Sequence, residues 1–428
     1  MSARRLFPQI VAFALFFTLS ELGVAADASV AATETNELGL DLYRKLATDE
    51  DNLCLSPYAI GNALAMTLAG ADGQTREEMV RVLHASKRDD IIHPSFAALR
   101  HDLAALVEQS IKRGMEANKY GSSEDPVSLA IAGRLFAQSG YDFREHFLTL
   151  LKEQYDAPLD SVDYVNAASA ATDRINPWVL EQTRDRIRDL IPAGMLNAAT
   201  RLVLVNAIYL KAPWATPFSN EATEPRPFRV RGEEKTNVPT MFAHERSFGY
   251  AKRDGYTAVS ISYSGSELQF LILLPDDAKG IHALEKKISA ATLAKAVKFE
   301  PRELNLYLPK FKFEPPAMDL AVTLQELGMR TAFNQPRGSA NFERIAPRKP
   351  DNYLFLSAVF HKTFLAVDEF GTEAAAANAL PVTVYSAELI GRKKLKPLVV
   401  KVDRPFFYAI QHVPSGACLF LGRVTDPR

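Results

Sequence analysis

Apolar residues repeat at helical spacing along the first half of the chain. Leucine or isoleucine recurs every four positions over 38–46 and again over 60–68, which predicts two amphipathic helices. Ser56-Pro57 predicts where the second begins, because serine accepts a hydrogen bond from a free backbone N–H and proline suits the first helical position. The TREE sequence at 75–78 has the form of a capping box and predicts a third helix. Residues 147–155 predict another.

Strand patterns dominate the second half. The run RLVLVNAIYLKAPW at 201–214 is almost continuously apolar, as expected for a strand buried on both faces. Residues 258–277 predict a hairpin that turns at Ser264-Gly265-Ser266. ELNLYLPKFKF at 303–313 and PLVVKV at 397–402 alternate with the period of a strand. Helices followed by strands predict an α+β fold.

The composition is that of an ordinary globular protein. The chain has 428 residues, of which 47% are hydrophobic and 24% are charged, with a formal net charge of -1. A charge so close to zero gives no reason to expect nucleic acid or an anionic surface as a partner. No shift in composition marks a boundary after the N-terminal segment, so we expect a single domain over 27–428.

The first residues have the pattern of a targeting segment. Arg4 and Arg5 precede an apolar run at 10–19, and small residues follow at 24–26. The run is too short to span a bilayer, so residues 1–26 are interpreted as a removed secretory signal peptide. The alternative is a membrane anchor that is retained. The signal interpretation predicts a secreted protein, or a periplasmic one if the source is bacterial.

Two cysteines, Cys54 and Cys418, are too few for a disulfide framework. Each lies in a short apolar run, where a free thiol behaves as a small buried hydrophobic group. A single bridge between them and two buried thiols are both open alternatives. In either case the stability of the chain must come from a large core.

The chain lacks the local motifs of the common enzyme classes. It contains no G-x-S-x-G elbow, no H-E-x-x-H and no phosphate-binding glycine loop, and its eight histidines show no metal-ligand spacing. A Ser/His/Asp triad built from distant positions stays open, because such triads are geometric. We therefore expect no catalytic activity, no cofactor and no metal.

Five separate motifs carry a family resemblance. They are NLCLSPYAIGNALAMTLAGADGQTREEM (52–79), INPWVLEQT (175–183), LVLVNAIYLKAPWATPF (202–218), FHKTFLAVDEFGTEAAAA (360–377) and DRPFFYAIQHVPSGACLFLGRV (403–424). In this order and at these separations, the chain resembles the serpins, a family of serine protease inhibitors. The resemblance implies the serpin fold, with three β-sheets, eight or nine helices and an exposed reactive-centre loop at about 369–400.

The resemblance also implies a mechanism. A target serine protease attacks the loop as a substrate and forms a covalent acyl complex with it. The cut loop then inserts into the main sheet as a new strand, and the attached protease is distorted before the ester hydrolyses. The implied partner is a serine protease, and the inhibitor itself is expected to be a monomer.

The segment GTEAAAANALP at 371–381 has the composition that such an insertion needs. By resemblance to inhibitory serpins, alternate residues from Thr372 face the core, while Glu373 and its alternates face solvent. Small inward groups avoid overpacking, and glycine permits the bend where insertion begins. Asn378 and Pro381 depart from the pattern, because one is a polar group facing inward and the other removes a ladder hydrogen bond. The hinge set is Glu369, Gly371, Thr372, Glu373, Ala374, Ala375, Ala376 and Ala377.

Two positions for the reactive bond follow from the family spacing. Counting sixteen residues forward from Glu369 places it between Tyr385 and Ser386, which suits a chymotrypsin-like protease. Counting back from the DRPF motif places it instead near Arg392, Lys393 and Lys394, which suits a trypsin-like protease. The basic residues Arg392, Lys393, Lys394 and Lys396 have three other interpretations, a solvated loop, a second cleavage site or an anchor for a polyanion.

Further residues match positions around the opening of the sheet. Ser56, Asn206 and His361 match a polar cluster beneath the strands that must part, and Ala59 stands where the family often has a second serine. Trp214 matches the tryptophan at the top of the sheet, where insertion starts. Lys310 matches a lysine that pairs with the hinge glutamate, here Glu369. Separately, Pro177 predicts a kink in the helix that carries INPWV.

Overall fold

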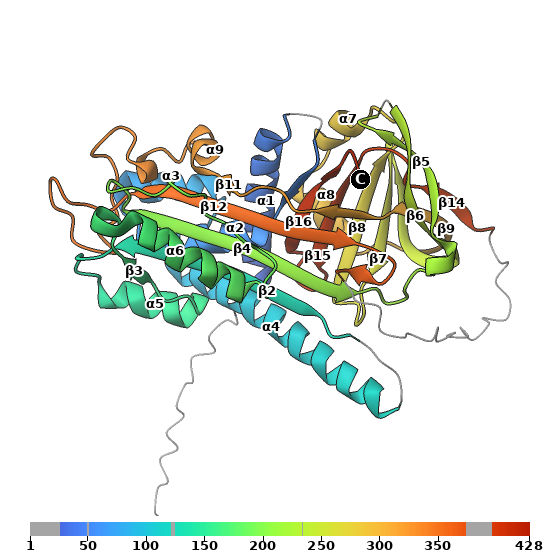
Figure 1. Ribbon diagram of the computed structural model, residues 1–428, viewed down its shortest axis with the longest axis horizontal. Coiled ribbons are helices and arrows are strands. Elements are labelled where there is room, and N and C mark those ends of the chain that lie inside the picture. The colour runs from blue at the N-terminus through green and yellow to red at the C-terminus, as the bar shows by residue number, and fades with distance from the viewer. Residues whose placement is uncertain (1–25, 49–50, 121–124, 233, 374–395) are drawn as a thin grey trace, which may run out of the picture.

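The computed structural model describes residues 26–48, 51–120, 125–232, 234–373 and 396–428. The expected signal peptide therefore lies almost wholly outside the described residues. Within the described part, the α-helices gather around two networks of strands (Figure 1). The nine α-helices of this part are α1 (Ala28–Leu46), α2 (Pro57–Ala69), α3 (Gly73–Val82), α4 (Asp89–Lys119), α5 (Glu145–Tyr155), α6 (Tyr164–Gln182), α7 (Ile281–Glu285), α8 (Ala290–Ala296) and α9 (Ala321–Glu326).

Several helices follow the sequence prediction closely. The leucine repeat at 38–46 lies in α1, and the Ser56 side chain caps α2 by accepting a hydrogen bond from the Ala59 N–H at 3.1 Å. The helix predicted at 147–155 is α5. All thirteen residues of α2 are buried, so this helix forms a central support between the two strand networks.

The predicted capping box is wrong. Helix α3 begins at Gly73, two residues before the predicted cap. Thr75 Oγ1 instead accepts a hydrogen bond from the Asn341 N–H at 3.0 Å, and Glu78 Oε2 accepts one from the Thr331 N–H at 2.7 Å. Both side chains are therefore used to attach the helix to a distant segment rather than to cap it.

The predicted kink at Pro177 is also wrong. Helix α6 runs through Pro177 to Gln182, and the residue with non-helical dihedrals is Ala167 (φ -145°, ψ 47°). The Asn176 side chain exchanges two hydrogen bonds of 2.9 Å with the backbone of Ile191. These tertiary contacts hold the helical conformation next to the proline, although proline removes one hydrogen bond of the helix.

One network contains seven described strands. Their order is β10-β12-β13-β4-β2-β3, and β11 pairs with β12 outside this path. Strand β4 is the apolar run predicted to be buried on both faces, and ten of its twelve residues are buried. Helix α6 covers one face of this sheet, while α2 lies behind the other (Figure 1). The strands are β2 (Ser128–Gln138), β3 (Asp160–Val162), β4 (Leu202–Pro213), β10 (Phe311–Phe313), β11 (Met318–Asp319), β12 (Leu356–Val367) and β13 (Gly371–Thr372).

The other network contains nine described strands. Its order is β1-β16-β15-β8-β7-β6-β9-β14, and β5 also pairs with β6. The long strand β6 pairs first with β5 and β9 and then with β7, so it joins two of the three expected sheets at the irregularity between Ala243 and Arg246. The strands are β1 (Leu53–Leu55), β5 (Glu224–Val230), β6 (Glu234–Arg253), β7 (Tyr256–Ser262), β8 (Leu268–Pro275), β9 (Pro301–Pro309), β14 (Leu398–Lys401), β15 (Phe406–His412) and β16 (Cys418–Val424).

Two strand predictions have different outcomes. The hairpin at 258–277 is confirmed as β7 and β8, which turn through Gly265 and Ser266 at positive φ. The single strand predicted at 303–313 is wrong, because the chain changes networks there. Strand β9 pairs with β6 and β14, whereas β10 pairs with β12. Lys310 occupies the crossing between them.

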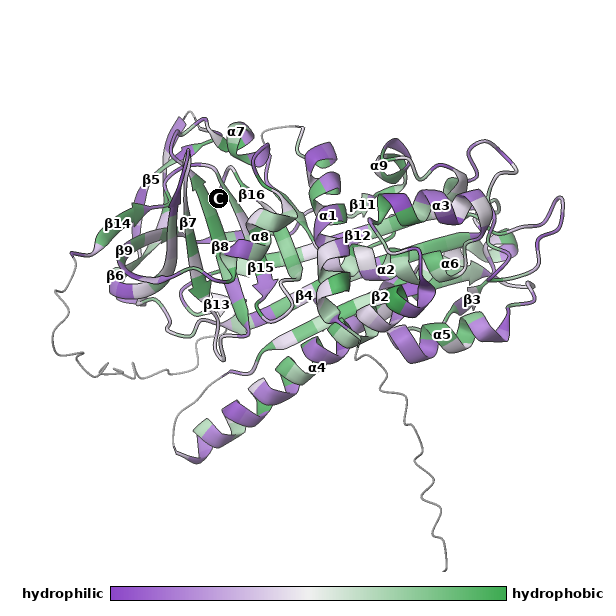
Figure 2. Ribbon diagram, turned by 180° about the vertical axis from the view of Figure 1, so that it is seen from behind, coloured by the Kyte–Doolittle hydropathy of each residue, from purple (hydrophilic) through white to green (hydrophobic). Residues whose placement is uncertain are grey.

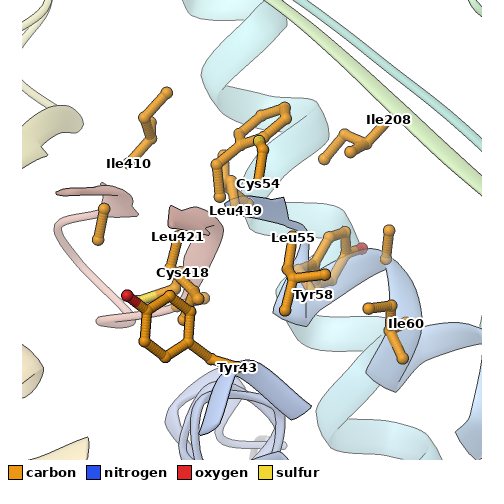
Figure 3. Packing of buried hydrophobic residues seen from close by; sticks show 14 of the residues in the cluster. Tyr43, Cys54, Leu55, Tyr58, Ile60, Ile208, Ile410, Cys418, Leu419 and Leu421 are labelled. Atoms are coloured by element: carbon orange, nitrogen blue, oxygen red, sulfur yellow. The ribbon is translucent and has the colours of Figure 1, made fainter. Parts of the chain in front are cut away.

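The core is continuous between the two networks, and apolar residues concentrate on the central strands (Figure 2). Both cysteines are buried in it as free thiols (Figure 3). Burial raises the pKa of Cys54 to about 11 and that of Cys418 to about 12, so neither is ionised near neutral pH. Among the described residues, no helix combines the length and apolarity needed to cross a membrane.

Candidate functional site

Strands β12 and β4 form a fork at one end of the seven-stranded sheet. They pair directly and in parallel from Leu356 opposite Leu202 to Phe364 opposite Tyr209. Beyond that point the short strand β13 lies between them. Thr372 of β13 is opposite Val367 of β12 and also pairs with the end of β4. The first hinge residues therefore already occupy the space between the two strands.

Burial and close packing hold β13 in the fork. The Thr372 side chain is fully buried, and its Oγ1 lies 2.5 Å from the hydroxyl of Tyr263. Gly371 has φ +154°, and a Cβ built on it would stand 2.1 Å from the carbonyl oxygen of Ala212. Only glycine fits this approach of two backbones. Tyr263 could not be found from the hinge sequence, because it comes from the turn after β7.

A tight turn over residues 368–371 connects β12 to β13. Asp368 Oδ1 accepts hydrogen bonds from the N–H groups of Phe370 (2.8 Å) and Gly371 (3.2 Å). Burial raises the pKa of Asp368, and these two N–H groups partly offset that effect. The sequence DEFG carries a signal for this turn, with aspartate first and glycine fourth, that the prediction missed.

Trp214 anchors the same turn from the end of β4. Its indole N–H donates to the Asp368 carbonyl at 2.9 Å, and its backbone N–H donates to the Phe370 carbonyl at 2.8 Å. The indole stacks on the Tyr263 ring with a centroid separation of 4.5 Å. Trp214 therefore lies at the end of β4, against the turn that leads into β13.

The expected ion pair between Lys310 and Glu369 is present. Lys310 Nζ lies 2.6 Å from Glu369 Oε2, and the Thr223 hydroxyl donates to the other carboxylate oxygen at 2.6 Å. The Glu369 side chain is only 4% exposed, whereas that of Lys310 is 35% exposed. Burial alone would raise the pKa of Glu369, but the bonds from Lys310 and Thr223 outweigh it, and the net shift is downward.

The prediction that Glu373 faces solvent was made for an inserted strand and stays a prediction, because β13 ends at Thr372 in this structure. The Glu373 side chain is 13% exposed, and its Oε1 lies 2.6 Å from Nε of Arg186. Its N–H still bonds to the Ala366 carbonyl at 2.9 Å, but its φ of 46° takes the backbone out of the strand region. The alternation that the prediction relied on therefore stops at Thr372. Burial raises the pKa of Glu373, with Arg186 opposing the shift.

Ser56, Asn206 and His361 form one hydrogen-bonded cluster between β12, β4 and α2. The Ser56 N–H donates to His361 Nε2 at 3.1 Å, and the opposite ring nitrogen bonds to Asn206 Oδ1. Asn206 Nδ2 also donates to the Phe360 carbonyl at 2.9 Å. All three side chains are fully buried, and burial lowers the pKa of His361 to about 3. The neutral imidazole therefore joins the two strands of the fork across their shared edge.

The rest of the predicted loop lies outside the described residues. This applies to the remaining hinge alanines, to both departures from the pattern and to both alternatives for the reactive bond. Lys396 is described and exposed, and its carbonyl accepts a bond from Arg302 at 3.4 Å. Where the structure is described, no three His, Cys, Asp or Glu residues could together hold a metal ion. The undescribed residues are Ala374, Ala375, Ala376, Ala377, Asn378, Pro381, Tyr385, Ser386, Arg392, Lys393 and Lys394.

The chain is similar to known proteins over most of its length. A family model described as serpin (serine protease inhibitor) matches residues 33–427. The leukocyte elastase inhibitor of Sus scrofa is 35% identical over 398 residues, which cover 91% of this chain and 97% of that protein. An uncharacterised serpin-like protein of Thermococcus kodakarensis is 34% identical and covers 92% of this chain and 85% of its own.

Solved structures show the same fold. Serpin48 of the insect Tenebrio molitor superposes with a TM-score of 0.75 at 28% identity, covering 93% of this chain and 98% of its own. Uncleaved ovalbumin superposes with a TM-score of 0.76 at 26% identity, covering 93% of this chain and all of its own.

Proposed function

Because this chain belongs to the serpin family of serine protease inhibitors, we propose that it traps its target protease covalently through loop insertion. The observation that carries the proposal is the position of β13. Thr372 already pairs with both β12 and β4 at the mouth of the fork, and Gly371 pairs with β4. In the proposed mechanism, insertion extends β13 from Thr372 along the fork.

The covalent step is ordinary acyl transfer to the protease. The protease serine oxygen attacks the carbonyl carbon of Tyr385, the bond to the Ser386 nitrogen breaks, and that nitrogen takes the proton. The product is an ester between the protease and the new C-terminus at Tyr385. Insertion then carries this ester along the fork, and trapping succeeds if insertion outpaces hydrolysis of the ester.

The cluster around His361 sets part of the resistance to insertion. His361 lies on β12 and Asn206 on β4, and their contact bridges the two strands where they pair directly. An entering strand must break this contact. The hinge residues that would enter first are small or already buried. The free-energy barrier to insertion therefore lies where β12 and β4 pair directly, rather than at the mouth of the fork.

The reactive bond decides which protease is inhibited. Tyr385 before the bond suits the deep apolar pocket of a chymotrypsin-like protease. The names of the curated relatives, leukocyte elastase inhibitors, support a serine protease as the target class. Cleavage at Arg392–Lys393 is the alternative, and it would suit a trypsin-like enzyme.

A second function is favoured by a specific feature of the sequence. Asn378 and Pro381 would both oppose complete insertion, for the reasons given above. A chain that is cut without completing insertion would be a non-inhibitory serpin, acting as a binding or chaperone module. The clean segment from Gly371 to Ala377 favours inhibition over this alternative.

We also propose that the mature protein is secreted, on the basis of the signal sequence at 1–26, and that it is a monomer, as the family resemblance implies. A polyanion at Arg392, Lys393, Lys394 and Lys396 would be an additional partner of the loop. N-terminal sequencing of the exported protein tests secretion, and gel filtration tests whether the protein is a monomer. An intact N-terminus on the exported protein would contradict the proposed signal peptide.

One experiment separates these functions. Mature protein is incubated with chymotrypsin and with trypsin, the products are run on a denaturing gel, and the cut is located by mass spectrometry. A stable complex with a fragment that begins at Ser386 is expected with chymotrypsin, and a Tyr385→Ala variant should lose it. Cleavage without any complex would contradict inhibition, and a cut after Arg392 or Lys393 would move the reactive bond.

A further inference from the structure

A second site lies at the end of the nine-stranded network, away from the fork. Strands β5, β6, β9 and β14 curl toward one another, and the chain after β14 returns to β5, where the Arg229 N–H donates to the Asp403 carbonyl at 2.8 Å. A cavity of about 280 Å³ lies inside this curl. None of the residues that line it belongs to β4, β12 or β13. In Figure 1 these strands occupy the end of the molecule opposite α5.

Four cations line the cavity. Arg226 and Arg229 come from β5, Lys235 from β6 and Lys401 from β14. Arg229 and Lys235 are directly opposite each other across the antiparallel pair of β5 and β6. Like charges in such a position destabilise a sheet unless a counter-charge is nearby. The strand pairing therefore concentrates positive charge that the packing of the sheet does not require.

Negative charge around the cavity is small by comparison. Asp403 is the only carboxylate in the cavity lining, and it already pairs with the neighbouring Arg404. Glu224 pairs with Arg226 at 2.9 Å, but that glutamate is 63% exposed. For the other three lining cations, the described part of the chain offers no carboxylate within 4.0 Å. The cavity is therefore a site of net positive charge with free ammonium and guanidinium donors.

An aromatic ring fixes two of these cations. The Arg226 guanidinium carbon lies 4.7 Å from the centroid of the Tyr307 ring, and Lys401 Nζ lies 5.8 Å from it. Phe242 stacks on the same ring at 4.5 Å. Arg226 Nε is buried and has no hydrogen-bond acceptor among the described residues. An unsatisfied buried donor costs free energy.

We propose that this cavity binds a tetrahedral oxyanion, a sulfate or phosphate ester carried on a ligand the size of a sugar. A guanidinium presents a rigid fork and an ammonium a point charge, and together they complement several oxygens on one central atom. The cavity is slightly below the usual range for small-ligand sites, so it holds one such group and cannot enclose a polymer. The site is separate from the basic loop residues at 392–396 and does not depend on the trapping mechanism.

Titration calorimetry on the mature protein tests the site with four probes. They are inorganic phosphate, inorganic sulfate, a sulfated disaccharide and inositol hexakisphosphate. We expect saturable binding of at least one organic probe, weakened by salt. Arg226→Gln and Lys401→Gln should each weaken binding by about tenfold, the effect of losing one charge-assisted hydrogen bond. Lys152→Gln, which removes an exposed charge from α5 at the opposite end of the molecule, should leave it unchanged.

Each outcome decides the proposal. Binding of the sulfated disaccharide alone identifies a sulfated ligand, and binding of the inositol phosphate alone identifies a phosphate ester. Binding that is equal in Arg226→Gln, Lys401→Gln and the parent would overturn the site, as would the absence of binding by all four probes. Because Lys401 is exposed on β14, Lys401→Gln should fold normally even if Arg226→Gln does not. Thermal melts of both variants check that they are folded. If Arg226→Gln and Lys401→Gln change only the rate of protease inhibition, and no small anion binds, the surface would be a docking site for a protein. That result would overturn the proposal.

Discussion

Replacing Thr372 by arginine should convert the chain from an inhibitor into a substrate. The Thr372 side chain is fully buried between β12 and β4, with its hydroxyl 2.5 Å from that of Tyr263. A guanidinium at this position must either enter the sheet or keep β13 out of it. In the first case a charge is buried in the sheet, and in the second β13 leaves the fork; both outcomes oppose the proposed insertion.

The size of the effect follows from burial. Desolvation of a charge at a fully buried position costs several kcal/mol, and the lost contact with Tyr263 adds about 1 kcal/mol. Even about 3 kcal/mol on the insertion barrier slows insertion by roughly a hundredfold. Hydrolysis of the acyl ester is not slowed, so it wins the competition and the cleaved protein is released.

The assay is titration of chymotrypsin with each variant, read as residual activity and as complex on a denaturing gel. Thr372→Arg should give cleaved protein and almost no complex. Thr372→Val keeps the branched shape and loses only the hydrogen bond, so it should retain most of the complex. A Thr372→Arg variant that forms complex at the parent stoichiometry would refute the argument. If the parent itself forms no complex, the rise in melting temperature after cleavage is compared instead, and it should be smaller for Thr372→Arg.

Three further predictions concern the same region. Gly371→Ala should expel β13 from the fork, because the new Cβ would stand 2.1 Å from the Ala212 carbonyl oxygen. Hydrogen–deuterium exchange over 366–373 should become faster, and unchanged exchange would contradict this prediction. Glu369→Lys should lower the free energy of unfolding by about 1–3 kcal/mol, because it breaks the ion pair with Lys310; the loss is limited because Lys310 is 35% exposed to solvent. The variant should also form multimers, and unchanged monomer on a native gel after mild heating would count against this. The pKa of His361 is about 3 in the folded protein and 6.5 in the unfolded chain. The contribution of this histidine to the free energy of unfolding is therefore complete above pH 6.5. It falls as the pH drops toward 3, by up to roughly 1.4 kcal/mol per pH unit. His361→Gln should flatten this part of the stability profile measured by urea unfolding, and an identical slope in the variant would show that another group titrates.

The elements that the sequence predicted well are those set by local chemistry. The cap at Ser56, the buried run of β4 and the hairpin turn after β7 each depend on a few neighbouring residues. The alternation over 303–313 is equally regular, yet it hides the crossing at Lys310 between the two networks. A period of two records which side chains face inward and contains no information about which strand lies alongside.

In the candidate site, too, contacts between distant segments were harder to predict than local features. The pairing of Lys310 with Glu369 was expected from the resemblance to the family, and the structure has it. The partners Tyr263 and Arg186 were missed, because each comes from a segment far away in the chain and neither has a local signal. The solvent-facing position predicted for Glu373 belongs to an inserted strand, whereas β13 ends at Thr372 in this structure.

The direction of the strands in the fork has a consequence for how this chain folds. Strands β12 and β4 are parallel to each other, whereas β13 is antiparallel to both. Extending β13 along the fork would exchange one parallel ladder for two antiparallel ladders, which are slightly stronger per residue. If the loop inserts as proposed, the inserted arrangement would therefore be the more stable of the two. In that case β12 and β4 would have to pair during folding before the segment after β13 competes for the same edges. The order of folding would then select the state, and the half-life of the described state would measure how long a variant keeps it.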